Sequence, residues 1–226
     1  IEYQIAIPSY QRYEMLKNKT LNTLKKHKIN SNLITIFVAN QKQFDEYSKG
    51  IPKSMYNKLI IGKKGLKNQR NFINSYYPEN TYLIQMDDDI DDIVELINPD
   101  GKKNISTPTY RKKNQLIPIK NLNLFFKNAF KLCRSEGTFL WGIYPLSNPY
   151  FMNFKTNIGL KFIVGPLWGC IVRHNAKLKL TIDEKENVER TLQYYSLDGK
   201  VIRFNNISIV TKYYKNPGGM QSNSRN

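Results

Sequence analysis

The chain has 226 residues, of which 40% are hydrophobic and 12% are aromatic. This length and composition fit one α/β domain with a substantial core, and they exclude low-complexity disorder over most of the chain. The net charge of +17 favours a polyanionic partner, because Lys and Arg gain affinity by releasing counterions from phosphates. The alternative is that codon bias in an AT-rich genome has enriched lysine together with Asn, Ile and Tyr.

Cysteine usage and hydropathy indicate the compartment. Cys133 and Cys170 are the only cysteines, which fits small buried thiols in a reducing cytoplasm better than a disulfide. No stretch approaches about 18 consecutive apolar residues and the first residues show no signal-peptide pattern, so a soluble protein without a membrane partner is expected. His27 and His174 have no close Cys or His neighbours in the sequence, which argues against a structural zinc site.

The first 92 residues alternate between apolar runs and segments with helical spacing. Strands are predicted at 3–8, 33–39, 58–62 and 82–86, and helices at 13–27, 41–48 and 66–76. This alternation predicts a parallel sheet with right-handed crossovers, in which ligands bind at the carboxyl ends of the strands. The polar loops that follow the strands should therefore lie together at one edge of the sheet.

After Asp92 the pattern becomes mixed. A turn at 98–101 and a basic loop at 102–114 precede an amphipathic helix at 119–135. Five further strands and one helix are predicted from short apolar runs, at 139–144, 162–166, 169–173, 201–204 and 207–213 for the strands and at 184–194 for the helix. We expect one domain over residues 1–217, with halves at 1–92 and 93–217, and a flexible Gly- and Ser-rich tail at 218–226.

Three consecutive carboxylates, Asp87, Asp88 and Asp89, directly follow the apolar strand at 82–86. Carboxylates at the end of a buried strand offer hard oxygen ligands to Mg²⁺ or Mn²⁺, and such a metal can bridge to a diphosphate. Without a cation these like charges would raise one another's pKa. A solvated acidic turn is the alternative, but such a turn would not need an apolar strand before it.

Two other loops follow strands and should reach the same edge. In the loop at 7–12, Pro8 fixes the chain direction, Tyr10 can stack on a base and Arg12 can reach a phosphate. The loop at 62–71 opens a helix, so its backbone N–H groups and Arg70 can point at an anion. Each loop alone also fits an ordinary turn.

The ordered set of Ile7 to Arg12, Gly65-x4-Arg70-Asn71 and Asp87 to Asp89 resembles the GT-A glycosyltransferases. The second half is similar to the viral and kinetoplastid enzymes that glycosylate hydroxymethylated pyrimidines in DNA, which include the base J glucosyltransferase and the group associated with TET/JBP dioxygenases. The features that carry this similarity are Gly142, Trp168-Gly169 and the segment Lys-Glu-Asn-Val-Glu-Arg at 185–190. The resemblance implies an α/β GT-A fold with a Rossmann-like, mostly parallel sheet flanked by helices. Residues 1–92 would then bind the nucleotide-sugar and 93–217 the acceptor.

The resemblance also implies a divalent metal, Mn²⁺ or Mg²⁺, and a UDP-sugar donor, with UDP-glucose expected. Asp87 to Asp89 would form the family's DxD motif, with Asp87 and Asp89 as metal ligands. The alternative register Asp89-Ile90-Asp91 shares Asp89. The expected donor-binding residues are Pro8, Ser9, Tyr10, Arg12, Asn40, Gly65, Asn68, Arg70, Asp87 and Asp88.

Many GT-A enzymes carry an acidic motif whose final Asp is the catalytic base. The matching triplet here is Lys185-Glu186-Asn187, and an amide cannot accept the proton. The candidate bases are therefore Glu186, Glu189 and Asp183, unless the protein is impaired. The family's later metal-binding His is also missing, since no His follows His174. Alternatively, 183–190 is an exposed helix with ordinary Glu–Arg pairs.

Two sets of residues are expected to meet the acceptor. Aromatic residues next to glycines could stack against an extrahelical base, although buried core aromatics are the alternative. Basic residues of the loop at 102–113 should bind DNA phosphates. These acceptor-binding residues are Trp141, Gly142, Tyr144, Trp168, Gly169, Arg111, Lys112 and Lys113.

The expected function is a metal-dependent, inverting transfer of a sugar to 5-hydroxymethyluracil or 5-hydroxymethylcytosine in DNA. A carboxylate at 183–189 would remove the acceptor proton while the metal and Arg70 stabilise the leaving diphosphate. For a viral or phage enzyme the expected location is the host cytoplasm. Two alternatives remain: a GT-A transferase acting on a polysaccharide or protein, and a non-catalytic nucleic-acid-binding module on a decayed transferase fold.

Overall fold

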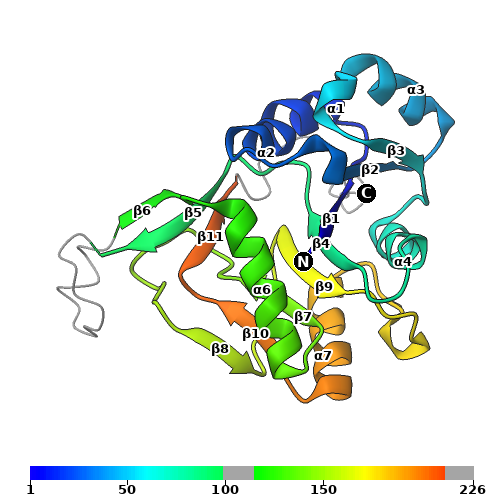
Figure 1. Ribbon diagram of the computed structural model, residues 1–226. Helices are drawn as coiled ribbons and strands as arrows, with labels where there is room; N and C mark the ends of the chain where they lie inside the picture. Colours follow the sequence, from blue (N-terminus) through cyan, green and yellow to red (C-terminus); the bar gives the residue numbers. More distant parts are fainter. Residues whose placement is uncertain (99–114, 212–226) are drawn as a thin grey trace.

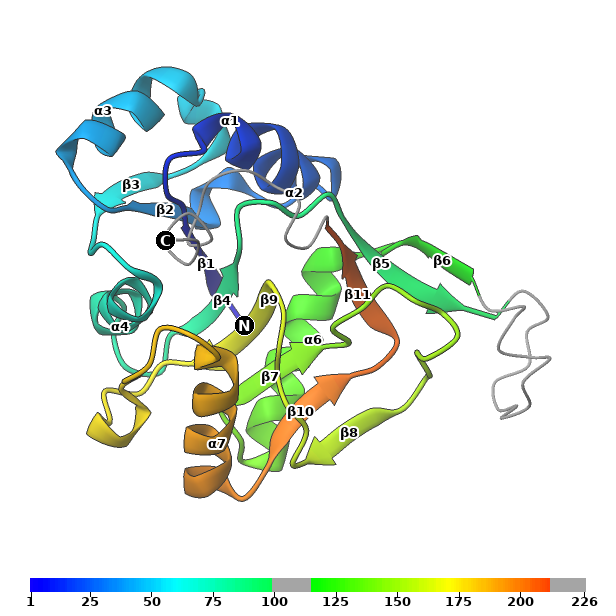
Figure 2. The ribbon, with the colours of Figure 1, turned by 180° about the vertical axis from the view of Figure 1, so that it is seen from behind.

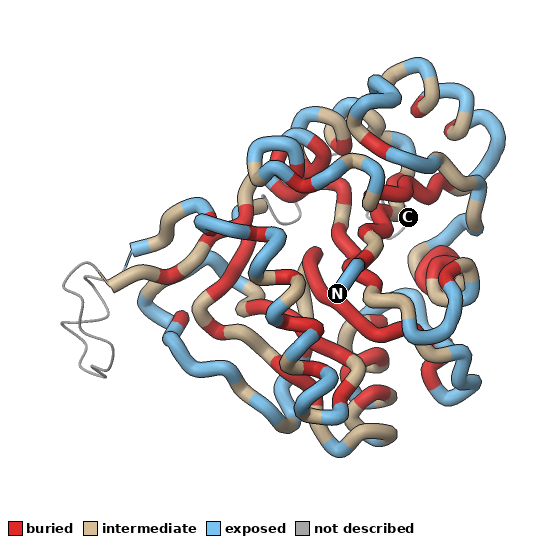
Figure 3. Tube along the Cα trace, in the orientation of Figure 1, coloured by how far each residue is buried: buried red, intermediate tan, exposed pale blue. Residues whose placement is uncertain are grey.

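A computed structural model describes residues 1–98 and 115–211. Its main feature is an eight-stranded sheet with the strand order β3-β2-β1-β4-β9-β7-β10-β8, accompanied by a three-stranded sheet with the order β11-β5-β6 (Figure 1). Helices pack against the central strands of the main sheet, while its two edge strands are partly exposed (Figure 1). Burial is accordingly concentrated on the central strands (Figure 3).

The first four strands are parallel neighbours, as the alternating pattern predicts. They are β1 (Tyr3–Pro8), β2 (Ile34–Val38), β3 (Lys58–Ile61) and β4 (Tyr82–Met86). Ile5 of β1 is in register with Ile34 of β2 and with Ile84 of β4. β2 is buried along its whole length, which explains why all its residues except Thr35 are apolar.

The connecting helices begin and end close to the predicted positions. The segment predicted as one helix consists of α1 (Tyr13–Leu16), a π-helical stretch η1 (Lys17–Leu21) and α2 (Asn22–Lys26). Asn40 caps α3 (Gln41–Gly50) by accepting a hydrogen bond from the Gln43 amide. α4 (Leu66–Tyr76) follows Gly65, whose φ of 87° suits glycine.

The second half adds mixed strands, as expected. β9 (Leu167–Ile171) runs antiparallel to β4 and to β7 (Leu140–Ile143), while β10 (Val201–Phe204) is parallel to β7. β8 (Thr156–Gly159) forms the outer edge, and the small sheet contains β5 (Asp92–Ile97), β6 (Gln115–Pro118) and β11 (Ile207–Val210). The helices are α6 (Leu122–Glu136) and α7 (Glu186–Asp198), and the short 3-10 turns are η2 (Ser31–Leu33), η3 (Lys53–Met55) and η4 (Ala176–Leu178).

Some predicted elements differ from the structure. The strand predicted at 162–166 is wrong, because this apolar stretch is irregular and is attached to α7 by a hydrogen bond from the Ile163 amide to Thr191. β5, β6 and β8 were not predicted, since their short runs lack a distinct period. The loop at 102–114, most of the turn at 98–101 and the tail at 218–226 lie outside the described residues.

The core is rich in aromatic residues. Trp141 has no exposed surface and contacts the rings of Phe125, Phe126, Phe130 and Phe204. Cys133 and Cys170 are buried free thiols, as predicted. Across residues 1–98 and 115–211, no helix has the length and apolar character required to cross a bilayer.

Candidate active site at the carboxyl ends of β1 and β4

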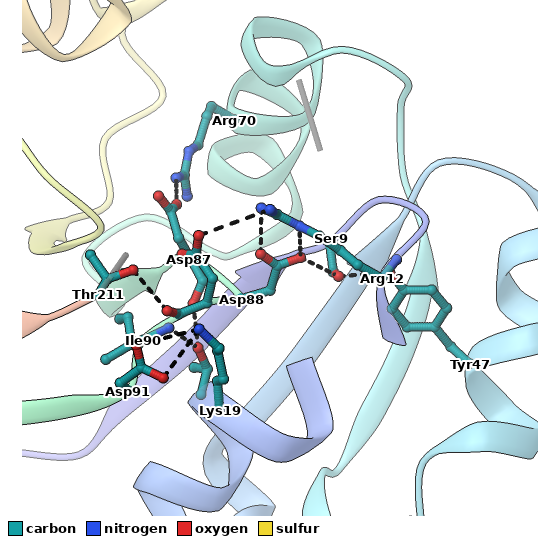
Figure 4. A network of polar contacts seen from close by, with 12 residues as sticks. Ser9, Arg12, Lys19, Tyr47, Arg70, Asp87, Asp88, Ile90, Asp91 and Thr211 are labelled. Carbon is teal, nitrogen blue, oxygen red and sulfur yellow. Dashed lines mark hydrogen bonds and ion pairs between the residues drawn. The ribbon is translucent and has the colours of Figure 1, made fainter. Parts of the chain in front are cut away.

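Two predicted site segments meet at one edge of the main sheet. Residues 9–12 follow β1, and Asp87 to Asp89 follow its neighbour β4. The two strands are parallel and in register, so their following loops emerge side by side. Figure 4 shows the guanidinium of Arg12 directed at Asp88, and that of Arg70 directed at Asp87.

Asp88 is the buried centre of this site, with 1% exposure. Ser9 Oγ donates a hydrogen bond to Asp88 at 2.5 Å, and Arg12 Nη2 lies 2.6 Å from the other carboxylate oxygen. The hydroxyl of Tyr47, which sequence reasoning missed, contacts Ser9 Oγ at 2.7 Å. Burial raises the pKa of Asp88 to about 6, against the lowering effects of Arg12 and Ser9.

Three expected donor-binding residues contact one another. Asp88 is enclosed by Ser9 and Arg12. Ser9 and Arg12 likewise direct their polar groups at Asp88, so that the three residues attach the first loop to β4. These contacts fix the position of the segment that carries Asp87 and Asp89.

Replacing Arg12 by methionine should lower the free energy of unfolding by about 3 kcal/mol, because it leaves the buried Asp88 carboxylate without its cation. Urea unfolding at neutral pH measures this difference. The double variant Arg12→Met/Asp88→Asn should recover part of the loss, since the uncompensated charge is then absent. Equal stabilities for wild type and Arg12→Met would contradict the structural role of the pair.

Asp87 is oriented by Arg70, which extends from α4. Arg70 Nη2 lies 2.7 Å from Asp87 Oδ1, and Arg70 Nη1 donates to Gln85 Oε1 at 2.8 Å. The guanidinium is thus fixed by one partner on β4 and one directly after it. The Asp87 side chain is 40% exposed, and that of Asp89 is 18% exposed. These two carboxylates flank buried Asp88 and both are partly exposed, with Arg12 Nη1 3.9 Å from Asp89 Oδ2.

The accessible pair Asp87 and Asp89 fits a metal that binds together with a diphosphate. Mg²⁺ in nucleotide sites is commonly held by one or two carboxylates, substrate phosphates and water. Within residues 1–98 and 115–211 there is no group of three or more His, Cys, Asp or Glu side chains able to hold a metal alone. Asp91, the end of the alternative register, is engaged by Lys19 Nζ at 3.1 Å.

The loop before α4 is shaped by backbone contacts. Gln69 accepts a hydrogen bond from the Lys63 amide and donates to the Val38 carbonyl, and a side chain at Gly62 would collide with it. Asn68 donates to the Lys64 carbonyl. Asn40 and Asn68 were both predicted to bind the donor. Each side chain forms a local hydrogen bond to the backbone, and that of Asn40 caps α3. The loop still lies at the same sheet edge.

The three candidate bases have different environments. Glu189 accepts hydrogen bonds from the Thr181 hydroxyl and amide and from the Ile182 amide; although burial opposes it, these bonds lower the pKa of Glu189. Glu186 is 5% exposed and is paired with Arg190 at 3.7 Å. Asp183 accepts from the Lys67 amide at 3.2 Å, at the start of α4, and its side chain is 52% exposed. Asp183 is therefore the most accessible of the three.

Arg190 forms a buried cluster, in contrast to the exposed helix with ordinary Glu–Arg pairs that was the alternative for 183–190. Its guanidinium lies 3.7 Å from the centre of the Trp168 ring and donates to Asn187 Oδ1 at 2.7 Å. Arg70 lies 5.7 Å from the same ring. Burial lowers the pKa of Arg190 to about 10, although Glu186 acts in the opposite direction. The spacing of Glu186 and Arg190 by four residues was the available sequence signal.

The two tryptophans of the predicted acceptor platform lie in the core. Trp141 is fully buried, and Trp168 is 3% exposed beneath Arg190. The adjacent glycines make room for core packing, since a side chain at Gly169 would collide with Trp141 and one at Gly142 with Ile163. Tyr144 is partly exposed, with Arg203 5.4 Å from its ring. The remaining predicted acceptor residues, Arg111, Lys112 and Lys113, lie outside the described residues.

Two solved structures share the fold of this chain at low sequence identity. The chain is similar to S. aureus TarS 1-349, with a TM-score of 0.56 and 11% identity over 92% of this chain and 59% of that one. A second S. aureus TarS structure matches with a TM-score of 0.54 and 10% identity, over 92% and 36%. GalNAc-T7 with UDP, GalNAc and Mn²⁺ has a TM-score of 0.48 and 13% identity, over 96% and 45%. The chain thus spans less than two thirds of these proteins.

Comparison of sequences identifies the family. No curated protein matches the chain. The family model described as TET-Associated Glycosyltransferase matches residues 3–219, which is nearly the whole sequence. The fold is of the GT-A type, as the resemblance implied, with a large, mostly parallel sheet flanked by helices. The chain belongs to the TET-associated glycosyltransferase family.

Proposed function

We propose that this chain moves a sugar from a UDP-sugar to the hydroxyl of a 5-hydroxymethylpyrimidine in DNA, with inversion at the transferred carbon. The observation that carries the proposal is the pair of accessible carboxylates, Asp87 and Asp89, on either side of the buried Asp88–Arg12 contact. The expected sugar is glucose.

On the donor side, Asp87 and Asp89 would hold Mn²⁺ or Mg²⁺. The metal would supply positive charge to the diphosphate as it leaves. Arg70 can add to this stabilisation, because its guanidinium is already fixed beside Asp87 by Gln85. Pro8 ends β1, and Tyr10 and Gly65 lie on loops at the same edge; these three are the remaining candidates for contact with the nucleotide.

On the acceptor side, Asp183 is the proposed general base. It is the most accessible of the candidate carboxylates. Its side chain contacts the start of α4, next to Gly65. Removal of the acceptor proton by Asp183 would accompany attack by the acceptor oxygen on the sugar carbon, opposite the diphosphate. A single displacement of this kind inverts the configuration of that carbon.

The net charge of +17 and the family support DNA as the acceptor. A target base in a duplex must be unstacked, at a cost of about a few kcal/mol. Trp141 and Trp168 are buried and cannot offset this cost by stacking without rearrangement. We therefore expect single-stranded or locally opened DNA to be a better acceptor than intact duplex.

Transfer should occur to hydroxymethylated DNA and not to plain DNA of the same sequence. The test is incubation with a panel of nucleotide-sugars and Mn²⁺ or Mg²⁺, followed by mass analysis of the released nucleosides. Single-stranded and duplex forms of each DNA test the unstacking argument, and chelation of the metal should stop the reaction. Transfer to a neutral oligosaccharide, with none to DNA under any donor, would favour a polysaccharide-modifying enzyme.

A non-catalytic nucleic-acid-binding module is the second candidate function. It is favoured by one observation: Asn187, at the position where many GT-A enzymes carry the catalytic base, accepts a hydrogen bond from Arg190 and has no carboxylate. Metal-dependent hydrolysis of a UDP-sugar in the absence of acceptor separates the two functions. Such hydrolysis by wild type, and its loss on metal removal, is expected only of a working donor site.

A further inference from the structure

A groove lies beside the loop that precedes α4, here called the donor loop, and runs between α4 and the segment 173–180 that contains η4. Both views show this segment next to α4 (Figure 1, Figure 2). The groove has a volume of about 870 Å³, which is large enough for several linked polar groups. One wall begins at Lys63 and Lys64, directly before Gly65, so that the groove and the proposed diphosphate site share a loop.

The walls of the groove are joined by specific hydrogen bonds. Asn71 on α4 donates to the Leu180 carbonyl and accepts from the Leu180 amide, both at 2.9 Å. Asn74 donates to the Arg173 carbonyl at 3.1 Å. These contacts attach both ends of the 173–180 segment to α4. The groove is therefore held open by the fold, and a ligand would not have to order its walls.

The groove is basic. Lys63, Lys64 and Lys179 line it and are exposed, and none of the twelve described lining residues carries a carboxylate. Among the described residues, none of these three ammonium groups forms an ion pair. Two carboxylates do touch the walls, but Glu79 accepts the His174 amide and Asp183 pairs with Lys67. The three ammonium groups can therefore bind an anion from outside the protein.

We infer that this groove binds the sugar–phosphate backbone of the DNA strand that carries the acceptor base. A strand presents several linked phosphates, which matches a groove lined by three lysines better than a single free phosphate would. Exposed His174 and the partly exposed ring of Phe72 add surfaces that a base or sugar can contact. The inference rests on the proposed function, because it assumes that the acceptor is DNA.

The test is the salt dependence of binding to a plain single-stranded oligonucleotide. Fluorescence anisotropy measures this binding. Each phosphate contact contributes about 0.7 to the slope of log affinity against log salt for single strands. The triple variant Lys63→Gln/Lys64→Gln/Lys179→Gln should therefore flatten the slope by about 2, and Lys179→Gln alone by about 0.7. Circular dichroism and thermal unfolding establish that the variants are folded.

The matched control is Lys42→Gln/Lys49→Gln/Lys131→Gln. It removes the same charge from exposed lysines on α3 and α6, outside the groove. Its slope should remain close to that of wild type. UDP binding in the presence of Mn²⁺ is measured in parallel for every variant, since Lys63 and Lys64 lie on the donor loop.

The possible outcomes distinguish a failure of the groove inference from a failure of the proposed DNA acceptor. Equal slopes for the groove variant and the control, with salt-dependent binding by wild type, would overturn the groove inference and leave DNA as the acceptor. A groove variant that loses UDP binding but retains the wild-type slope would assign the groove to the donor. Wild-type protein that does not bind the oligonucleotide at low salt would overturn the inference together with the proposed DNA acceptor.

Discussion

Asp89→Asn should abolish the metal-dependent binding of UDP and of the UDP-sugar. The substitution keeps the size of the side chain but replaces a charged ligand by an amide, which binds Mg²⁺ or Mn²⁺ less strongly next to a diphosphate. Calorimetric titration of UDP with and without Mn²⁺ measures the loss. Turnover should fall to the level seen when the metal is chelated.

The control for this variant is Asp91→Asn, which tests the alternative register. Asp91 is 34% exposed on its side chain and is paired with Lys19, so its replacement should leave metal-dependent binding nearly unchanged. Loss of binding in Asp91→Asn with normal binding in Asp89→Asn would move the metal to the second register. Normal binding in both would show that the diphosphate site lies elsewhere.

Asp183→Asn should reduce turnover by about 100-fold or more with little change in donor affinity, as expected when a general base is lost. The amide oxygen of asparagine can still accept the hydrogen bond from the Lys67 amide, so the start of α4 should keep its geometry. Single-turnover kinetics with saturating donor, together with direct titration of UDP, separate the chemical step from binding.

Glu186→Gln and Glu189→Gln are the comparisons. Glu189 accepts hydrogen bonds from Thr181 and Ile182. Glu189→Gln should therefore lower the thermal stability, with only a small effect on turnover. Glu186→Gln should weaken the contact with Arg190. A 100-fold effect confined to Glu186→Gln would transfer the role of base to that residue, and near-normal turnover in all three would place the base outside 183–189.

The donor half of the fold was largely predictable from local pattern. The strand at 82–86 and the helix at 66–76 have the predicted bounds, because short apolar runs and helical spacing report directly on burial at these positions. Convergence of the loops after β1 and β4 also followed from sequence, since parallel strands end at the same sheet edge. The irregular 162–166 stretch was mistaken for a strand because its apolar residues form no strand pairing: Ile163 is buried, whereas Phe162 is exposed.

The roles of individual side chains were decided by contacts between distant parts of the chain. Ser9 and Asp88 are 79 residues apart in sequence, and their hydrogen bond is what encloses the middle carboxylate and leaves its two neighbours accessible. Trp141 became a core residue through contact with α6 and β10, and Asp183 remained exposed while Glu186 was buried against Arg190. Composition and spacing report how many carboxylates and aromatic rings the site region contains. Their exposure depends on which surfaces cover them, and that is a property of the packed tertiary structure alone.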